Sequence, residues 1–129
     1  MDDYMEDDIL TAATTTAVEH VLDALNRHDV DALMAGMTAD CVFEDTLPPP
    51  DGTRYAGQEA VRRYFEAFFR RSREASFEVE ERFAAGDCCA VRHLYRWVEE
   101  DGIPGHVRGA TLFRVRSGHV AEMRAYVKG

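Results

Sequence analysis

Hydrophobic residues recur at helical spacing in the first half of the chain and alternate with polar residues in the second half. The first helix is expected to begin at Thr16, because Thr16 and Glu19 have the spacing of a capping box. The second is expected to begin after Asp29, a residue type that caps helices well, and the third near Gln58. The three helical stripes consist of Val18, Val21, Leu22 and Leu25, then Val30, Leu33, Met34 and Met37, then Val61, Tyr64, Phe65 and Phe68.

After Ala75 the period of the pattern falls to two, which predicts strands. A short earlier strand, CVFED at residues 41–45, runs into a proline-rich loop that cannot continue a regular ladder. Turn signals at EEDG and SG separate the later strands into an antiparallel meander. These strands are expected to begin at Phe77 and to follow near residues 88–99, 105–116 and 119–127. Helices first and sheet second predict an α+β domain, with the helices on one face of a curved sheet.

Length and composition predict a single, acidic domain. The chain has 129 residues, 46% of them hydrophobic, and we expect an acidic N-terminal tail at residues 1–15 followed by a domain at residues 16–129. The formal net charge of −9 disfavours nucleic acids and anionic membrane surfaces as partners. No apolar stretch is long enough to span a membrane and no secretory signal opens the chain, so a cytoplasmic protein is expected. Its three cysteines have no CxxC spacing and are expected to be reduced.

Three segments carry a resemblance to a known family: ALNRHDVDALMAGMTADCVFED, GQEAVRRYFEAFF and GATLFRVRSGHVAEMRAY. They resemble the nuclear-transport-factor-2-like (NTF2-like) superfamily, and within it the SnoaL-like polyketide cyclases and ketosteroid isomerases, over about residues 16–127. The resemblance implies a cone-shaped fold, in which a strongly bent, mostly antiparallel sheet wraps around three N-terminal helices. It also implies an apolar pocket at the open end of the cone and a homodimer built on the outer face of the sheet.

Asp45 ends the strand CVFED where, by this resemblance, ketosteroid isomerases carry their general base. Alternation along the strand places Cys41, Phe43 and Asp45 on one face. Asp45 would then be a carboxyl whose pKa is raised by apolar neighbours and which moves a proton at a carbon beside a carbonyl. The alternative is an aspartate that caps the proline loop.

The strand CCAVRHLYRWVEE offers further candidates, because period two places His93, Tyr95 and Trp97 on one face. His93 either pairs with Asp45 as an acid/base dyad or is an ordinary core histidine. Tyr95 and Trp97 either provide donors and stacking surface or fill the core. The catalytic candidates are therefore Asp45, His93 and Tyr95, and the residues expected to contact the substrate are Phe43, Phe65, Trp97, Thr111 and Phe113.

The positions of the two oxyanion donors of the isomerases are occupied here by Val21 and Thr111. Since removing one such donor typically costs about a hundredfold to a thousandfold in rate, efficient ketosteroid isomerisation is not expected. We expect either a cofactor-free proton-transfer enzyme of the isomerase, cyclase or dehydratase type acting on a small hydrophobic carbonyl compound, or a non-catalytic ligand-binding or dimerisation module. Epoxide hydrolysis would need an Asp, Arg, Asp constellation, of which only Asp45 is available.

The remaining sequence patterns give no further catalytic candidates. No histidines have metal-ligand spacing and no nucleotide-binding motif is present, so neither a metal nor a cofactor is expected. Leu94 and Tyr126 face outward on the predicted sheet, which favours a homodimer. One face of the third predicted helix is basic and is either an anion-binding surface or a solvated helix face. Its arginines are Arg62, Arg63, Arg70, Arg71 and Arg73.

Overall fold

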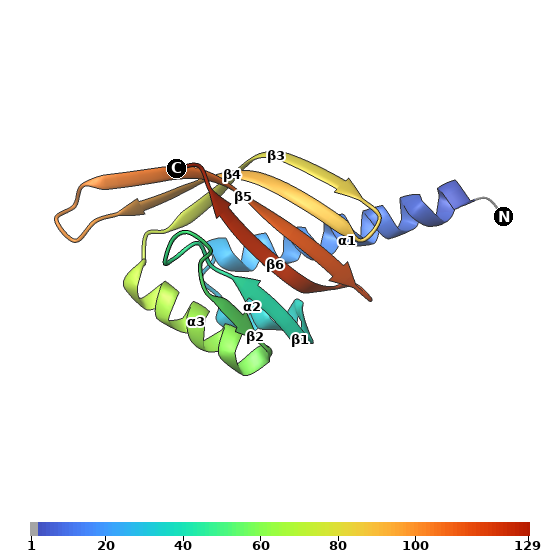
Figure 1. Cartoon of the computed structure of the whole chain (residues 1–129), viewed down its shortest axis with the longest axis horizontal. Helices are drawn as coiled ribbons and strands as arrows, with labels where there is room; N and C mark the ends of the chain where they lie inside the picture. Colours follow the sequence, from blue (N-terminus) through green and yellow to red (C-terminus); the bar gives the residue numbers. More distant parts are fainter. Residues whose placement is uncertain (1–2) are drawn as a thin grey trace.

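The computed structural model describes residues 3–129, which form three helices and six strands (Figure 1). The helices are α1 (Asp3–Asn26), α2 (Val30–Ala35) and α3 (Gln58–Arg71). The strands are β1 (Met37–Glu44), β2 (Arg54–Ala56), β3 (Ser76–Ala85), β4 (Cys88–Val98), β5 (Pro104–Arg116) and β6 (His119–Val127). Met1 and Asp2, which belong to the expected acidic tail, lie outside the described residues.

The strands form one curved sheet in the order β2-β1-β6-β5-β4-β3. Neighbouring strands are antiparallel except β1 and β6, which pair in parallel. All three helices lie on one side of the sheet (Figure 1). The expected α+β cone with a mostly antiparallel sheet is confirmed, and so is the meander from β3 to β6.

The core lies between the helices and the concave face of the sheet. Val18, Val21 and Leu25 of α1 are almost fully buried, as the helical spacing predicts, and α3 buries Val61 and Phe65. Burying a side chain of this kind contributes about 1.5–3 kcal/mol relative to leaving it in water. The two helical stripes therefore fix how α1 and α3 are oriented on the sheet.

Helix α1 begins at Asp3, so the predicted start at Thr16 is wrong. Threonines favour helices only weakly, but two of them bond to the β3–β4 turn. Thr11 Oγ1 accepts a hydrogen bond from the Gly86 amide at 2.9 Å, and Thr14 Oγ1 donates to the Gly86 carbonyl at 2.7 Å. These distant contacts hold the helix where local preference is weak. Its first turns extend beyond the strands (Figure 1).

The remaining elements match the sequence pattern closely, with two differences. Asp29 caps α2 as predicted, because its carboxylate accepts a hydrogen bond from the Ala32 amide at 3.0 Å. However, Met37, which was wrongly assigned to the stripe of the second helix, begins β1 ahead of the predicted CVFED segment, and the expected loop contains β2. Tyr55 pairs with Phe43 across these two strands. This short pairing was not visible in the sequence because three residues are too few to show a period.

The outer face of the sheet is largely covered by charged side chains. Leu94, expected to be exposed there, is only 5% exposed, so it gives no reason for a dimer. Its cross-strand neighbours are Glu78 and Arg108, whose long stems can cover it. Tyr126 is 52% exposed, in keeping with its predicted outward position. None of the helices within residues 3–129 is both long and apolar enough to cross a membrane.

Candidate functional site

A small cavity of about 100 Å³ lies between α3 and the concave face of the sheet. Its volume is below the range of pockets for drug-sized ligands, about 300–1,000 Å³, and nearer to that of an apolar cavity of about 150 Å³ that admits benzene. Six of the expected residues line it: Phe43, Asp45, Phe65, His93, Tyr95 and Thr111. Further residues in its wall include Tyr64, Phe68, Phe77 and Met123. The cavity thus suits a ligand with a small apolar part.

Trp97 and Phe113 were expected in this wall and lie elsewhere. The Trp97 ring packs on Gly105, and its indole N–H donates to Glu99 Oε1 at 2.9 Å, beyond the outer end of the cavity. Phe113 is 3% exposed and belongs to the core deeper in the cone. Alternation identified the correct face of both strands, but it does not say how far along a strand the cavity extends.

Asp45 lies where the chain leaves β1, and the following loop folds back on it. Its amide donates to the Thr53 carbonyl at 2.9 Å, and its Oδ1 accepts from the Thr46 amide at 2.8 Å. Gly52 has a positive φ of 76°, and a Cβ there would approach the Asp45 carbonyl to 1.8 Å. Only glycine fits so close to the backbone. The loop therefore holds Asp45 at the edge of the cavity, where it is half-buried.

The partner of Asp45 is Tyr64, a residue that sequence reasoning assigned only to a helical core stripe. Burial raises the pKa of the Tyr64 hydroxyl, and the charge of Asp45 and a hydrogen bond to it raise it further. Tyr64 therefore remains protonated and donates to the carboxylate. Apolar periodicity gave no signal of this role, because a tyrosine inside a helical stripe looks the same whether its hydroxyl meets a carboxylate or solvent.

His93 is paired with Thr111 rather than with Asp45, so the expected dyad is not formed. The His93 Nε2 and Thr111 Oγ1 atoms lie 2.9 Å apart, and both side chains are about 95% buried. Burial lowers the pKa of His93, with a smaller opposing effect from the charge of Glu80, so the ring is neutral at neutral pH. Among the described residues, its Nδ1 is the one buried side-chain atom that lacks a hydrogen-bond partner. Leaving a buried polar atom without a hydrogen bond costs free energy. Such atoms are rare, and a functional role is one reason for their presence.

Tyr95 joins the cavity to an aromatic cluster. Its ring stacks on Phe77 with centroids 4.8 Å apart, and Phe77 in turn meets the His93 ring edge-on at 5.5 Å. Burial raises the pKa of the Tyr95 hydroxyl, although a hydrogen bond with Ser72 lowers it in part. Tyr95 is thus a neutral donor at the cavity wall. Such ring contacts also hold the side chains in fixed orientations.

Val21, at one of the two oxyanion-donor positions inferred from the resemblance, is fully buried and offers no hydrogen-bonding group. Thr111, at the other, uses its hydroxyl to hold His93. The polar groups on the cavity are therefore arranged around Asp45 and Tyr64 on one side and around His93 and Thr111 on another.

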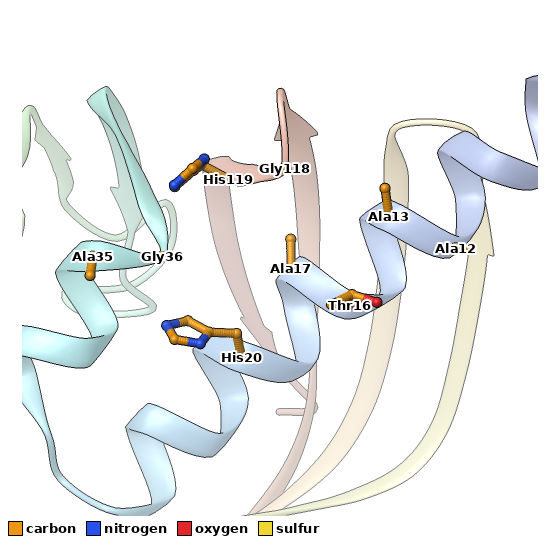
Figure 2. A pocket seen from close by; sticks show the side chains of 9 residues that line it. All are labelled: Ala12, Ala13, Thr16, Ala17, His20, Ala35, Gly36, Gly118 and His119. Carbon is orange, nitrogen blue, oxygen red and sulfur yellow. The ribbon is translucent and has the colours of Figure 1, made fainter.

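A larger hollow of about 510 Å³ lies outside the cone, between α1, the end of α2 and the β5–β6 turn (Figure 2). Two imidazoles line it, but each uses one nitrogen on the backbone: His20 Nε2 lies 2.9 Å from the Ala32 carbonyl oxygen and His119 Nδ1 3.1 Å from that of Ser117. Most of the other lining residues are alanine or glycine. Within residues 3–129 no cluster of three His, Cys, Asp or Glu side chains is placed to hold a metal ion. The smaller inner cavity, with its carboxylate and unpartnered imidazole, is therefore the better candidate site.

Comparisons with known proteins agree with the fold. The SnoaL-like domain family matches residues 18–123. A search of curated proteins found no match. Among solved structures, an NTF2-like protein of unknown function from Mesorhizobium loti is 35% identical, with a TM-score of 0.78 and coverage of 92% of this chain and 93% of that one.

Two further solved structures are similar at lower identity. A Sinorhizobium meliloti protein described as a polyketide cyclase is 26% identical, with a TM-score of 0.69 and coverage of 84% of this chain and 92% of that one. A Mycobacterium tuberculosis protein in complex with estradiol-17β-hemisuccinate is also 26% identical, with a TM-score of 0.76 and coverage of 88% and 92%.

Proposed function

Because this chain belongs to the SnoaL-like family, as the sequence resemblance indicated, we propose that it is a cofactor-free proton-transfer enzyme acting on a small hydrophobic carbonyl compound. The observation that carries the proposal is that one apolar cavity is lined both by the carboxylate of Asp45 and by the neutral imidazole of His93, whose Nδ1 has no partner within the described chain. A base and a nearby donor are the groups that proton abstraction beside a carbonyl needs.

Asp45 takes the proton in this proposal. It removes a proton from the carbon next to the carbonyl, and the electron pair of the broken C–H bond moves toward the carbonyl oxygen. The Tyr64 hydroxyl orients the carboxylate from the other side. Return of the proton to a different carbon gives an isomerase, attack of the carbanion on a second carbonyl gives a cyclase, and loss of a hydroxide from the neighbouring carbon gives a dehydratase.

The charge that develops on the substrate oxygen needs a donor across the cavity, drawn from His93, Tyr95 and Thr111. When the Thr111 hydroxyl donates to His93 Nε2, the neutral ring carries its proton on Nδ1 and can donate that proton to the oxygen. The Tyr95 hydroxyl is the second neutral donor. Groups of this kind take over the role of the donors that Val21 and Thr111 replace.

The proposal is tested by hydrogen–deuterium exchange, which requires no knowledge of the final product. Small ketones and keto acids with three to six carbons are incubated in D₂O with the protein, and loss of the proton beside the carbonyl is followed by NMR. Wild-type protein should accelerate the exchange for some members of this panel. Replacing Asp45→Asn keeps the shape and removes the base, so the acceleration should fall about a hundredfold or more.

Asp51→Asn is the matched control, because Asp51 is an exposed acid in the same loop and does not line the cavity. It should exchange as the wild type does. Equal rates for wild type and Asp45→Asn would contradict proton transfer by Asp45.

The alternative is a non-catalytic binding module of the same fold, favoured by the apolar residue Val21 at a donor position. Absence of exchange together with a small molecule retained through purification, detected by native mass spectrometry, would support that alternative.

We also propose that the protein forms a homodimer through the outer face of the sheet. Phe83 is 62% exposed there and Leu112 45%, and both border a shallow hollow with Cys88 and Ala90. Large apolar side chains gathered on a sheet face favour association. Sedimentation at micromolar concentration should show a dimer, and Leu112→Asp should shift it toward monomer. A wild-type monomer would contradict this assembly.

A further inference from the structure

The arginines of this acidic chain fall into two groups. Almost every arginine within residues 3–129 forms an ion pair with a carboxylate. The exceptions are Arg70 and Arg71 in the last turn of α3 and Arg73 just after the helix ends. With a net charge of −9, carboxylates are in excess. Positive charge left uncompensated at one place in such a protein is an attractive site for an external anion.

Two of these arginines line a groove beside the candidate site. The groove has a volume of about 850 Å³, and Arg63, Arg70 and Arg71 form its α3 wall. Arg63 is already paired with Glu59 at 2.8 Å. Leu47 and Pro48 contribute to the opposite, apolar wall. Arg70 and Arg71 are thus the two cations of the groove without an ion-pair partner, and Arg71 also donates a hydrogen bond to the Tyr64 hydroxyl oxygen.

The groove and the inner cavity meet at Asp45 and Tyr64, which line both. The Arg71 guanidinium carbon lies 5.6 Å from the centre of the Tyr64 ring and 5.3 Å from that of Phe68, both of which also line the cavity. Contacts of this type hold a cation against the aromatic faces. The charge of Arg71 also lowers the pKa of the Tyr64 and Tyr95 hydroxyls, against the larger effect of burial. Arg71 is therefore within electrostatic range of the cavity.

Arginines near the C-terminus of a helix also interact favourably with the negative end of the helix dipole. That role requires no particular side-chain direction, so it does not explain why Arg71 packs on two cavity residues. Asp45 would repel an anion at its own end of the groove. An anionic ligand is thus oriented, with its charge toward the end of α3 and its uncharged part toward Asp45.

We propose that the substrate of this site is a small amphipathic carboxylate, whose branched or aromatic end enters the cavity and whose carboxylate binds Arg70 and Arg71. This inference rests on the proposed function, because it names the substrate class for the same cavity. The planar guanidinium presents a fork of N–H donors that matches a carboxylate in geometry. In a keto acid of this kind, with the carboxylate held at the groove and the apolar end in the cavity, the ketone between them passes Asp45, which can remove a proton from the carbon beside that ketone.

Binding is tested without turnover by isothermal titration calorimetry. The probes are 4-methylpentanoate, its uncharged isostere 4-methylpentanamide, and 3-methylbutyl phosphate. The carboxylate should bind at least about tenfold more tightly than the amide, since hydrogen bonds between two charged groups are stronger than those to a neutral amide. Binding of the phosphate more tightly than the carboxylate would overturn the carboxylate assignment.

The variants are Arg70→Gln, Arg71→Gln and the control Arg73→Gln. Arg73 is likewise without a carboxylate partner but does not line the groove. Arg70→Gln and Arg71→Gln should each weaken carboxylate binding about tenfold, and Arg70→Gln should leave amide binding unchanged, whereas Arg73→Gln should stay within about twofold of wild type. Because Arg71 packs on two rings, the thermal unfolding of each variant is measured beside its titration. If Arg71→Gln unfolds, the test rests on Arg70→Gln, since Arg70 contacts no aromatic ring within residues 3–129.

Equal affinity for carboxylate and amide, no binding of either at millimolar concentration, or an equal loss in Arg73→Gln would overturn the proposal. The proposed proton transfer fails separately. If Asp45→Asn keeps wild-type isotope exchange while the arginine variants lose carboxylate affinity, the carboxylate site stands and the catalytic role of Asp45 does not.

Discussion

The two faces of strand β4 carry opposite kinds of polar group. On the concave face, His93 and Tyr95 stand among aromatic rings with few polar neighbours. On the convex face, Arg92 and Arg96 lie among glutamates of β3 and form ion pairs with them. One strand of alternating residues thus builds a sparse polar site on one side and a dense charged surface on the other.

This difference concerns how each polar group is compensated. An exposed ion pair is screened by water and salt, and losing it leaves both partners solvated. A buried polar group that loses its partner cannot bond to water instead, so the full desolvation penalty reduces the free energy of unfolding. Substitutions on the concave face should therefore have large, specific effects, and those on the convex face small ones.

The largest effect is expected for Phe65→Ala. Phe65 is 3% exposed and its ring contacts Phe43 and Tyr64 with centroids 4.8 and 5.0 Å apart. Removing it leaves a cavity in the aromatic cluster and should reduce the free energy of unfolding by about 3–5 kcal/mol, measured by urea denaturation.

Phe83→Ala is the matched substitution on the convex face, since that ring is 62% exposed. At a concentration low enough for the monomer, it should change the free energy of unfolding by only about 0.5 kcal/mol. A comparable loss at both positions would break the contrast between the faces.

An intermediate effect is expected from the pH dependence due to His93. Burial lowers the pKa of His93 in the folded state, so as pH falls through about 6.5 the unfolded chain gains a proton that the folded chain does not. Stability is unaffected above this pH and decreases below it, with a slope of at most about 1.4 kcal/mol per pH unit.

Urea denaturation between pH 7.5 and 5 should show this slope in the wild type and a smaller slope in His93→Gln. The other histidines are present in both proteins, so the difference between the slopes isolates His93. Identical slopes would mean that His93 is protonated equally in the folded and unfolded states.

The smallest effect is expected for Arg96→Gln. Arg96 and Glu78 lie 3.7 Å apart with both side chains more than half exposed. Exposed pairs contribute about 0.2–1 kcal/mol, and less at high salt. Thermal unfolding at low and at 1 M salt should show a small loss that shrinks with salt. A loss as large as that of Phe65→Ala would contradict the interpretation of the convex face as a compensated surface.

Periodicity along the sequence predicted the division between these faces. His93 and Tyr95 line the cavity because the strand alternates, and Phe43 and Asp45 follow from the same rule on β1. These predictions succeed because they depend only on the local geometry of an extended chain. The outward position of Leu94 also follows from alternation, but its burial could not be predicted, since it depends on the long side chains of neighbouring strands.

The features that were missed depend on contacts between distant segments. The pairing of Tyr64 with Asp45 joins a helix to the end of a strand, and the N-terminal half of α1 is held by Gly86 in the β3–β4 turn. No local preference encodes either contact. The boundary between an acidic tail at residues 1–15 and a domain at residues 16–129 stays a prediction, although α1 crosses it without a break.

The parallel pairing of β1 with β6 has a consequence for the order of events during synthesis. The end of β1 that leads into Asp45 pairs Glu44 with Arg124, about eighty residues later in the chain. A nascent chain leaves the ribosome from its N-terminus, so β1 is available long before the strand that must lie beside it. Until β6 emerges, one edge of β1 is open and can pair with β2 alone. The carboxylate therefore reaches its final position only when the last strand is added, and a ribosome-stalled chain ending before residue 119 should lack the completed cavity.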